Sequence, residues 1–420
     1  MNSGDLHQKL GPALPRIRRR SEDAERARSI PAATIEDLKA TGLFRSFIPP
    51  RFGGNQSAIL PVFDALMALG GACTSTAWVA SLFVMHAIMV RWLSERAQEE
   101  VWGEDPDALI ASSVAPLGTL TPSDGGFILN GRWSFSSGVD HAGWIVLLGT
   151  VSESSSTVKP EVRVCLLRAS QITIEDDWHV SGLRATGSKS VSVQNVFVPE
   201  HRSEDMKSIQ TGRFRGRHSG PASLVHVPWR PFLNYTYCPA AIGTARAALE
   251  LYRERTLTRR AAYTGESFRA KPMSWVRLAS AAAELDAAEL TLRRDIEDFE
   301  RYSAVDRSRR LAIEARAEFG ASRAVELCRH AVEIVYRGSG GGALYEKSAM
   351  QRYFRDVNAI TQHAALDIDA ALERYGRALL ASVSYAVVQP RESSAAPLTM
   401  PSLVGQRQTN RLRMGARPRS

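Results

Sequence analysis

Residues 131–141 read Gly-Arg-Trp-Ser-Phe-Ser-Ser-Gly-Val-Asp-His, a glycine-bounded stretch in which small hydroxyl side chains surround an indole. Trp133 beside Ser136 and Ser137 suits a planar polar heterocycle, because an indole stacks on a ring face while hydroxyls and backbone amides meet the ring edge. Ser112 and Ser113, on another short predicted strand, extend this polar set. An ordinary hairpin with a serine-rich strand has the same composition, so both interpretations stay open.

This stretch lies in a block, residues 109–230, of short β-rich runs separated by Gly, Asp, Ser and Pro turns. Apolar residues with helical spacing occupy residues 31–108 before it and residues 231–386 after it. The pattern contains no alternation of strands and helices that would build a doubly wound sheet. We therefore predict a mainly helical protein with a central β domain, either a compact barrel or a sandwich.

The third block predicts long helices joined by short breaks. Apolar residues such as Leu285 and Leu292 recur on one helix face, a second helix is predicted from about Arg309 to Tyr336, and a third covers Ala349–Leu380. The run Gly338–Gly342 ends a helix instead of opening one, so it is interpreted as a helix-breaking turn and not as a phosphate loop. Helices with such short connections form an antiparallel bundle.

The chain has 420 residues and a formal net charge of +9, which raises the question of a nucleic-acid partner. Residues 1–30 carry +3 and residues 393–420 carry +5, so the body between them is nearly neutral. A nucleic-acid site needs a basic stripe on a folded face. We expect instead a solvated basic extension at residues 1–30, a basic and disordered tail at residues 387–420, and no nucleic-acid partner.

Cysteine spacing and hydropathy give mostly negative expectations. The four cysteines are more than 70 residues apart, which matches no metal or redox motif, and we predict no metal site. The longest apolar run, Thr76–Val90, is shorter than the ~20 residues that a membrane span needs. With no apolar signal-like segment at the start of the sequence, we expect a cytoplasmic protein that does not enter a membrane.

Two of the nine histidines stand out as candidates for acid–base chemistry. His86 interrupts an apolar helix, where an imidazole needs a partner or faces a cavity. His363 follows Arg355 and Asp356 in a segment whose Asn and Gln residues suggest a polar lining. Each histidine is a possible general acid or base near neutral pH, and a buried structural histidine is the simpler alternative for each. The chain has no serine-hydrolase elbow, zinc-protease motif or dinucleotide fingerprint.

The order of four segments resembles the acyl-CoA dehydrogenase fold, and within it the oxygen-using branch. They are GRWSFSSGVDH at 131–141, WHVSGLRATGSK at 178–189, NVFVP at 195–199 and RYFRDVNAITQH at 352–363. This branch contains the oxygenase components of two-component flavin monooxygenases that act on 4-hydroxyphenylacetate, phenolic seco-steroids and aromatic polyketides. The resemblance spans about residues 31–385. It implies an N-terminal helical domain, a middle β-barrel and a C-terminal four-helix bundle.

One position separates this chain from the dehydrogenases that it resembles. In the dehydrogenases a Glu nine residues after the Arg-Asp pair removes the α-proton of the acyl thioester, and Gly-Thr follows it. Here Ala364 occupies that position, Ala365-Leu366 replace Gly-Thr, and His363 stands beside it. The resemblance therefore favours a monooxygenase over dehydrogenation of a thioester.

The resemblance assigns roles position by position. Five residues match positions that hold the flavin ring, with Ser136 or Ser137 near its N5: Ser112, Ser113, Trp133, Ser136 and Ser137. A hydrogen bond there slows peroxide loss from a C4a-(hydro)peroxyflavin. His86 and His363 match histidines around substrate and peroxide, one deprotonating a phenol and the other donating a hydrogen bond.

Further positions imply a cofactor shared between subunits. Gly340 and Gly341 match a glycine pair that reaches the flavin of a neighbouring subunit, which implies a homotetramer. Arg255, or Arg259, is a candidate for the flavin phosphate, with a poorer match around it. The family implies exchangeable reduced FMN or FAD, O2 as cosubstrate, and an NAD(P)H:flavin reductase that supplies the reduced flavin.

Three alternatives to an aromatic hydroxylase remain at this point. The first is an acyl-CoA dehydrogenase-like enzyme or oxidase with a relocated base at Asp367 or Asp369. The second is an oxygenase that acts on nitrogen or sulfur. The third is a binding protein that has lost its flavin affinity. The substrate is not specified by any motif, although we expect the segment from Lys207 to Arg230 to form part of the pocket wall.

Overall fold

The computed structural model describes residues 3–55, 57–152, 160–216 and 227–380. The helices of the first part are α1 (Ser3–Leu10), α2 (Leu14–Ala27), α3 (Ala32–Ala40), α4 (Ile59–Ala72), α5 (Thr74–Arg91) and α6 (Glu95–Trp102). The strands are β1 (Ile110–Ser123), β2 (Gly126–Ser136), β3 (Trp144–Val151), β4 (Val162–Arg168), β5 (Thr173–Glu175), β6 (Lys189–Pro199) and β7 (Ser203–Asp205). The later helices are α7 (Met206–Gln210), α9 (Trp229–Asn234), α10 (Cys238–Thr258), α11 (Pro272–Glu300), α12 (Arg307–Ser339), α13 (Ala349–Thr361) and α14 (Ile368–Leu380).

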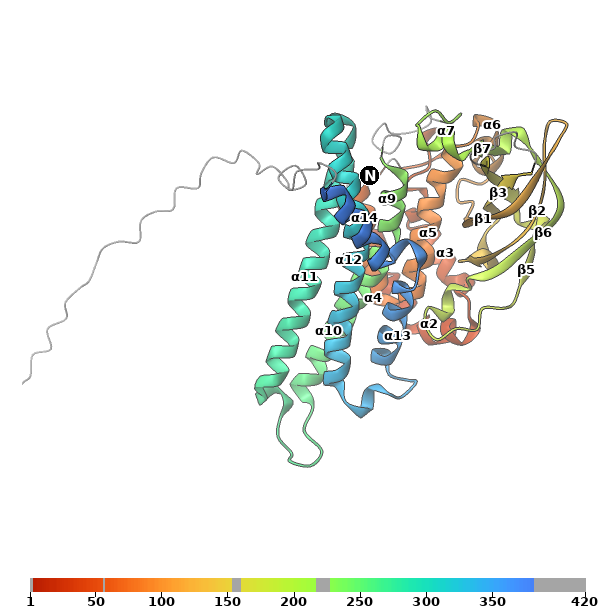
Figure 1. Ribbon diagram of the computed structural model, residues 1–420. Helices are drawn as coiled ribbons and strands as arrows, with labels where there is room; N and C mark the ends of the chain where they lie inside the picture. Colours follow the sequence, from red (N-terminus) through yellow and green to blue (C-terminus); the bar gives the residue numbers. More distant parts are fainter. Residues whose placement is uncertain (1–2, 56, 153–159, 217–226, 381–420) are drawn as a thin grey trace, which may run out of the picture.

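Helix α5 is the central element of the molecule. It lies between the sheet and the C-terminal helices, in contact with β1 and β3 on one side and with α10 on the other (Figure 1). Nearly every residue of α5 is buried, because its own apolar and small side chains lie on all sides of the helix. The side chains of α5 can therefore reach both the sheet and the bundle.

Within the described ranges, no helix is both long enough and apolar enough to cross a membrane.

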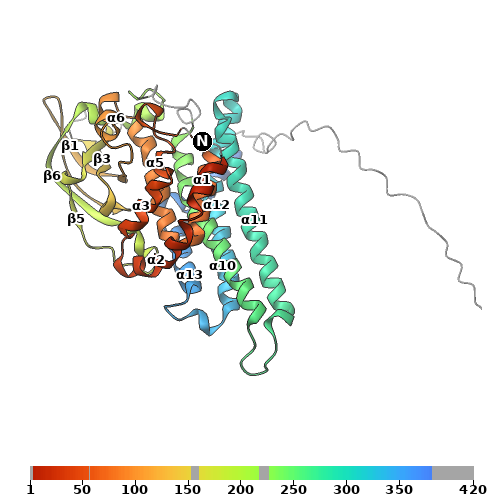
Figure 2. The same cartoon turned by 180° about the vertical axis from the view of Figure 1, so that it is seen from behind.

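The first thirty residues differ from the predicted solvated extension. They form α1 and α2, whose Leu10 and Ile17 are almost completely buried, and α1 and α2 pack on α4 (Figure 2). The high density of charge concealed an apolar stripe at helical spacing. Charged residues of this segment also tie distant parts together, since Arg28 pairs with Asp176 and Glu25 pairs with Arg355. The expectation of a solvated N-terminal end is wrong.

The central β block is one seven-stranded sheet with the order β5-β6-β2-β1-β3-β4-β7. Its pairs are antiparallel except β1 with β3, which run parallel. The register shifts between Trp133 and Ser136 on β2, and Phe135 inside this bulge adopts φ 68°. A bulge re-aims the side chains of a strand and bends it. The serine-rich stretch of the sequence therefore lies at an irregular end of β2.

The C-terminal block is a bundle in which α10, α11 and α12 run beside one another and α12 also packs on α13 and α14. The mainly helical class with a central sheet agrees with the prediction. The single helix predicted over Ala349–Leu380 is wrong, because α13 ends at Thr361 and a short 3-10 turn, Ala364–Leu366, precedes α14. His363 stands at this break in an extended backbone conformation.

Candidate active site

Helix α5 carries the two side chains around which the candidate site is organised, Trp78 and His86. They are separated by eight residues, which corresponds to about 12 Å along the helix and about 80° of rotation around it. Both side chains are buried, at 6% and 4% exposure. Trp78 faces the end of β2 and the break at His363, whereas His86 faces the start of β1. One rigid helix thus fixes both ends of the site.

His86 is held by two groups of β1. Its Nδ1 lies 2.6 Å from the carbonyl oxygen of Ile110, and its Nε2 lies 2.8 Å from the hydroxyl of Ser112. A carbonyl oxygen can only accept, so Nδ1 carries the proton and Nε2 accepts the Ser112 hydroxyl proton. Burial lowers the pKa of His86 to about 4, which keeps the ring neutral at neutral pH. His86 therefore has the partners that a buried imidazole needs, and both of them belong to β1.

His363 is held in the opposite sense. Its Nδ1 accepts the backbone N–H of Ala365 at 3.2 Å, so the proton of the neutral ring is on Nε2. The ring is half-buried and packs on Tyr237, with 4.1 Å between ring centroids, and on the edge of Trp78 at 5.7 Å. Burial lowers the pKa of His363 to about 4. The helix break therefore brings a neutral ring with its proton on Nε2 into the aromatic cluster.

Ser137 joins the sheet to this cluster. Its hydroxyl accepts the indole N–H of Trp78 at 3.0 Å and contacts the hydroxyl of Ser188 at 2.7 Å. Ser188 in turn lies 2.6 Å from the hydroxyl of Thr186. Ser136 differs from Ser137, because its hydroxyl is fully buried and has no hydrogen-bond partner among the described residues. The geometry therefore connects Ser137, and not Ser136, to Trp78 and His363.

Trp133 does not occupy the position predicted for it. Its indole is completely buried, and its N–H donates to the carbonyl of Leu148 at 2.9 Å. Gly118 and Gly131 leave room for the ring, since a Cβ at Gly118 would lie 2.3 Å from it. Strand alternation directs this side chain into the interior of the sheet. The prediction that Trp133 stacks on a flavin ring is wrong, and Trp133 is a core residue.

Phe135 is an aromatic residue that the sequence analysis passed over. Its side chain is 70% exposed, and it meets Trp178 edge to face with ring centroids 6.1 Å apart. A bulky residue with positive φ is uncommon and marks a turn, strain or function. The sequence signal was its place between Ser134 and Ser136, but only the backbone of the bulge reveals that it points outward. An exposed aromatic face beside serine hydroxyls suits a flat polar ring.

The remaining predicted residues lie in several places. The Ser113 hydroxyl donates to the carbonyl of Ser134 at 2.9 Å, which ties β1 to the bulge of β2. Gly340 has φ 66° at the end of α12, where a Cβ would meet the guanidinium of Arg259, while Gly341 borders open space. Arg259 donates to the carbonyl of Ser339 at 2.7 Å, and Arg255 lies one turn earlier, half-buried, on α10. These two glycines and Arg255 are remote from the cluster of Trp78 along the chain.

Comparison with known proteins gives the family. Residues 235–368 match the model described as acyl-CoA dehydrogenase, C-terminal domain. The chain is 34% identical to the oxygenase subunit HsaA, a flavin-dependent monooxygenase of Rhodococcus jostii, over 88% of this chain and 96% of that protein. The chain belongs to the oxygenase components of two-component flavin-dependent monooxygenases. The fold class and the family expected from the sequence are confirmed.

The chain is also similar to two further proteins of this kind. It is 30% identical to the oxygenase component of p-hydroxyphenylacetate 3-hydroxylase from Acinetobacter baumannii, over 89% of this chain and 88% of that one. The crystal structure of XiaF from Streptomyces in complex with FADH2 has a TM-score of 0.83 and 25% identity, over 90% of this chain and 97% of that chain. The exposed Phe135 and the hydroxyls of Ser112 and Ser137 are groups that fit a flavin ring.

This protein also has a cavity of about 340 Å³ near the C-terminal end of α5. Its walls include Ile88 of α5, Trp92 directly after that helix, the segment 209–212, and Trp229 of α9. Ile88 is two residues from His86, so the two side chains lie on different faces of α5. The expectation that residues 207–230 form part of the substrate pocket stays a prediction: described residues of that segment line this cavity, and residues 217–226 lie outside the described ranges.

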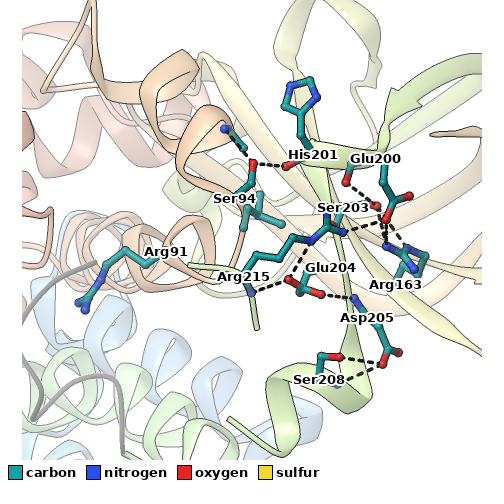
Figure 3. A network of polar contacts seen from close by, with 12 residues as sticks. Arg91, Ser94, Arg163, Glu200, His201, Ser203, Glu204, Asp205, Ser208 and Arg215 are labelled. Atoms are coloured by element: carbon teal, nitrogen blue, oxygen red, sulfur yellow. Dashed lines mark hydrogen bonds and ion pairs between the residues drawn. The ribbon is translucent and has the colours of Figure 1, made fainter. Parts of the chain in front are cut away.

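Ion pairs and hydrogen bonds hold the segment 203–216, which runs beside this cavity, on the sheet (Figure 3). Arg215 donates to the carbonyl of Ser203 at 2.8 Å and pairs with Glu200 at 2.9 Å, while its backbone N–H donates to Glu204. Arg163 of β4 binds the same Glu200 carboxylate at 2.9 Å. The segment that leads from β7 to residue 216 is therefore anchored on the sheet by charged groups with several hydrogen bonds each.

Proposed function

We propose that this protein hydroxylates an aromatic substrate with O2 and with reduced FMN or FAD received from a separate NAD(P)H:flavin reductase. The observation that carries the proposal is the pair of neutral histidines whose protons lie on opposite ring nitrogens, Nδ1 in His86 and Nε2 in His363, together with an exposed Phe135 and serine hydroxyls. When bound, the reduced flavin supplies the reaction with O2 that delivers the oxygen atom. The protein then has to activate the substrate, hold the flavin ring and exclude water.

Ser112 and His86 form the base of this proposal. The Ser112 hydroxyl donates to the unprotonated Nε2 of His86, so this hydroxyl can take a phenolic proton as its own proton moves to the imidazole. The carbonyl of Ile110 holds the Nδ1 proton and so stabilises the imidazolium that results. Loss of the phenolic proton raises the electron density of the ring carbons. The pair therefore prepares an aromatic ring for attack on an electrophilic oxygen.

His363 has the complementary task. Its Nδ1 is occupied by the Ala365 amide, so in the neutral state the ring offers only the Nε2 proton. A neutral donor in an aromatic, half-buried setting suits an oxygen atom that becomes negative during the reaction. Tyr237 and Trp78 pack against the ring and hold its orientation. His363 therefore holds a proton at Nε2 for an oxygen of the substrate or the cosubstrate.

The flavin would lie along the bulge of β2. Phe135 offers a face for stacking, and Ser137 offers its hydroxyl to the ring edge. We include Gly340, Gly341 and Arg255 as contacts to the flavin of a neighbouring copy in a homotetramer, since these residues lie on elements remote from β2. A location in the cytoplasm, where reduced flavin and its reductase are found, completes the proposal.

The test combines binding and turnover with the purified protein. Reduced FMN and FAD are titrated anaerobically, O2 is admitted, and products are separated for a panel of phenols, with thioethers and hydroxylamines added for sulfur and nitrogen oxygenation. We expect O2 consumption only with reduced flavin, and a hydroxylated phenol. Oxidation of NADH by the isolated chain would contradict the need for a separate reductase. Bleaching of bound flavin by an acyl-CoA would favour the dehydrogenase alternative.

A further inference from the structure

Four hydrogen-bonded side chains connect the candidate flavin face to the backbone of the loop before β6. From the indole of Trp78 the contacts run to the hydroxyls of Ser137 (3.0 Å), Ser188 (2.7 Å) and Thr186 (2.6 Å). They end where the Thr186 hydroxyl meets the carbonyl oxygen of Leu183 at 2.8 Å. We call this series the hydroxyl chain. All of its hydroxyl groups belong to residues that are at most 6% exposed.

The two ends of the hydroxyl chain fix the direction of every hydrogen bond in it. The carbonyl of Leu183 has no proton, so the single hydroxyl proton of Thr186 must lie on that side. Ser188 must then donate to Thr186, because two oxygens at 2.6 Å without a proton between them repel each other. By the same reasoning Ser137 donates to Ser188. At the other end the indole of Trp78 can only donate, and Ser137 accepts from it.

Ser137 is therefore left with a lone pair and no free proton. A ligand that approaches its hydroxyl can donate a hydrogen bond to it and cannot accept one from it. The hydroxyl cannot simply rotate, since rotation would break the contact with Ser188 and leave two buried oxygens facing each other. The protein has thus set the polarity of this hydroxyl before any ligand binds.

We propose that Ser188 and Thr186 are positioning residues that make this site discriminate between the redox states of the flavin. The proposal rests on the proposed function, in which Ser137 meets the edge of the flavin ring, and it takes N5 as the atom that Ser137 meets there. Reduced flavin carries an N–H at N5, which donates, whereas oxidised flavin has a bare nitrogen there, which accepts. A Ser137 hydroxyl that can only accept matches the reduced form and opposes a lone pair to the oxidised one.

The C-terminal bundle holds the far end of the hydroxyl chain in place. The buried carboxylate of Asp356 on α13 accepts the backbone N–H of Leu183 at 2.7 Å. Leu183 itself has φ 53°, an unusual conformation for this residue type that a specific contact must stabilise. The same helix α13 leads directly to His363. The direction of the hydroxyl chain and the position of the catalytic histidine thus depend on one helix.

The test measures affinity and not turnover. Dissociation constants for oxidised and reduced FMN are determined anaerobically for the wild type, Ser188→Ala and Thr186→Val. Each substitution frees the Ser137 proton to point at the ligand, so we expect oxidised FMN to bind about 2- to 10-fold more tightly, the value of one hydrogen bond. Reduced FMN should be affected less, because the lone pair of Ser137 remains. The potential of the bound flavin should fall by about 30 mV for each tenfold change in the ratio of the constants.

Ser190→Ala is the matched control. Ser190 is two residues from Ser188, is equally buried, and donates its hydroxyl to Ser134 at 3.2 Å, outside the hydroxyl chain. Its substitution should leave the ratio of the two constants unchanged. Melting temperatures of all variants establish that each is folded, and two independent breaks in the chain keep the test valid if one variant does not fold.

The outcomes separate this inference from the proposed function. Equal binding of both redox states by the wild type overturns the inference alone, as does a ratio that neither Ser188→Ala nor Thr186→Val changes. A gain in affinity for oxidised FMN in both variants, without one in Ser190→Ala, supports it. A wild type that binds neither form overturns the function and the inference together.

Discussion

The surroundings of His86 and His363 shift the pKa of the two rings alike but give them different hydrogen bonds. Burial lowers the pKa of both rings to about 4. His86 is enclosed within a regular helix and donates from Nδ1 to a carbonyl, which leaves Nε2 as an acceptor. His363 stands at a helix break and accepts an amide at Nδ1, which leaves Nε2 as a donor. In each ring the group bound at Nδ1, and not the pKa, therefore decides whether Nε2 accepts or donates a hydrogen bond.

The largest expected effect comes from removing the acceptor side of this comparison. His86→Ala removes the proton acceptor for Ser112, and we expect the rate of hydroxylation to fall about 10²- to 10⁴-fold, the usual contribution of general base catalysis. Single-turnover product formation with reduced flavin measures the effect. The control is His330→Ala, an exposed histidine on α12 that pairs with Glu284. A hydroxylation rate within a few-fold of the wild type would remove His86 from the mechanism.

The second prediction concerns stability and pH at the same residue. His86 binds a proton near pH 4 when folded and near pH 6.5 when unfolded, so the unfolded chain takes up more protons between these values. Stability should therefore fall by up to about 3 kcal/mol as the pH is lowered from 6.5 to 4. His86→Asn should lose this component, as measured by urea unfolding across the pH range.

A carboxylate complicates the reading of that experiment. Burial raises the pKa of Asp356 to about 6, so its contribution changes with the opposite sign between pH 3.8 and 6. Asp356 is present in both proteins, and the difference between wild type and His86→Asn isolates the histidine. Parallel pH profiles for the two proteins would mean that His86 is not buried as a neutral ring.

The third prediction removes the donor side. His363→Ala should lower coupled hydroxylation by about 10- to 100-fold, the value of a hydrogen bond to a charged group, and should increase H2O2 release. Flavin affinity should change little, since Ser137 and Phe135 remain. Product yield and peroxide are measured per reduced flavin consumed. An unchanged product yield would exclude a role for the Nε2 proton.

The smallest expected effect extends the comparison to two aromatic residues of β2. Phe135→Ala should weaken flavin binding by about 2- to 10-fold, as expected for the loss of one stacking contact, with no loss of stability, because the side chain is exposed. Trp133→Phe should instead cost about 1–3 kcal/mol of stability, because the buried carbonyl of Leu148 loses its donor. Titration and thermal unfolding of both variants distinguish the two roles. The reverse pattern would restore Trp133 as the flavin contact.

The sequence predicted those parts of the site whose signals are local. His86 was identified because it interrupts an apolar helix, and His363 because it follows the Arg-Asp pair. Trp133 was assigned wrongly, since the bulge that directs Phe135 outward has no distinct residue pattern. The break at His363 contains neither Gly nor Pro, so a continuous helix was predicted through it.

Contacts between distant segments were beyond the reach of sequence patterns. Ser188 lies about fifty residues from Ser137, and no spacing rule connects the two hydroxyls. The N-terminal helices were missed for a different reason, because high local charge suggested solvation while Leu10 and Ile17 are buried. The fold class was predicted correctly because the helical and β periods change sharply near residues 109 and 230.

The packed N-terminal segment has a practical consequence for handling the protein. Ser29 donates to Asp140, Arg28 pairs with Asp176, and Glu25 pairs with Arg355. The segment therefore connects the β2 bulge region, the loop before β6 and α13. Removing the first thirty residues as a dispensable basic extension would break all three contacts at once.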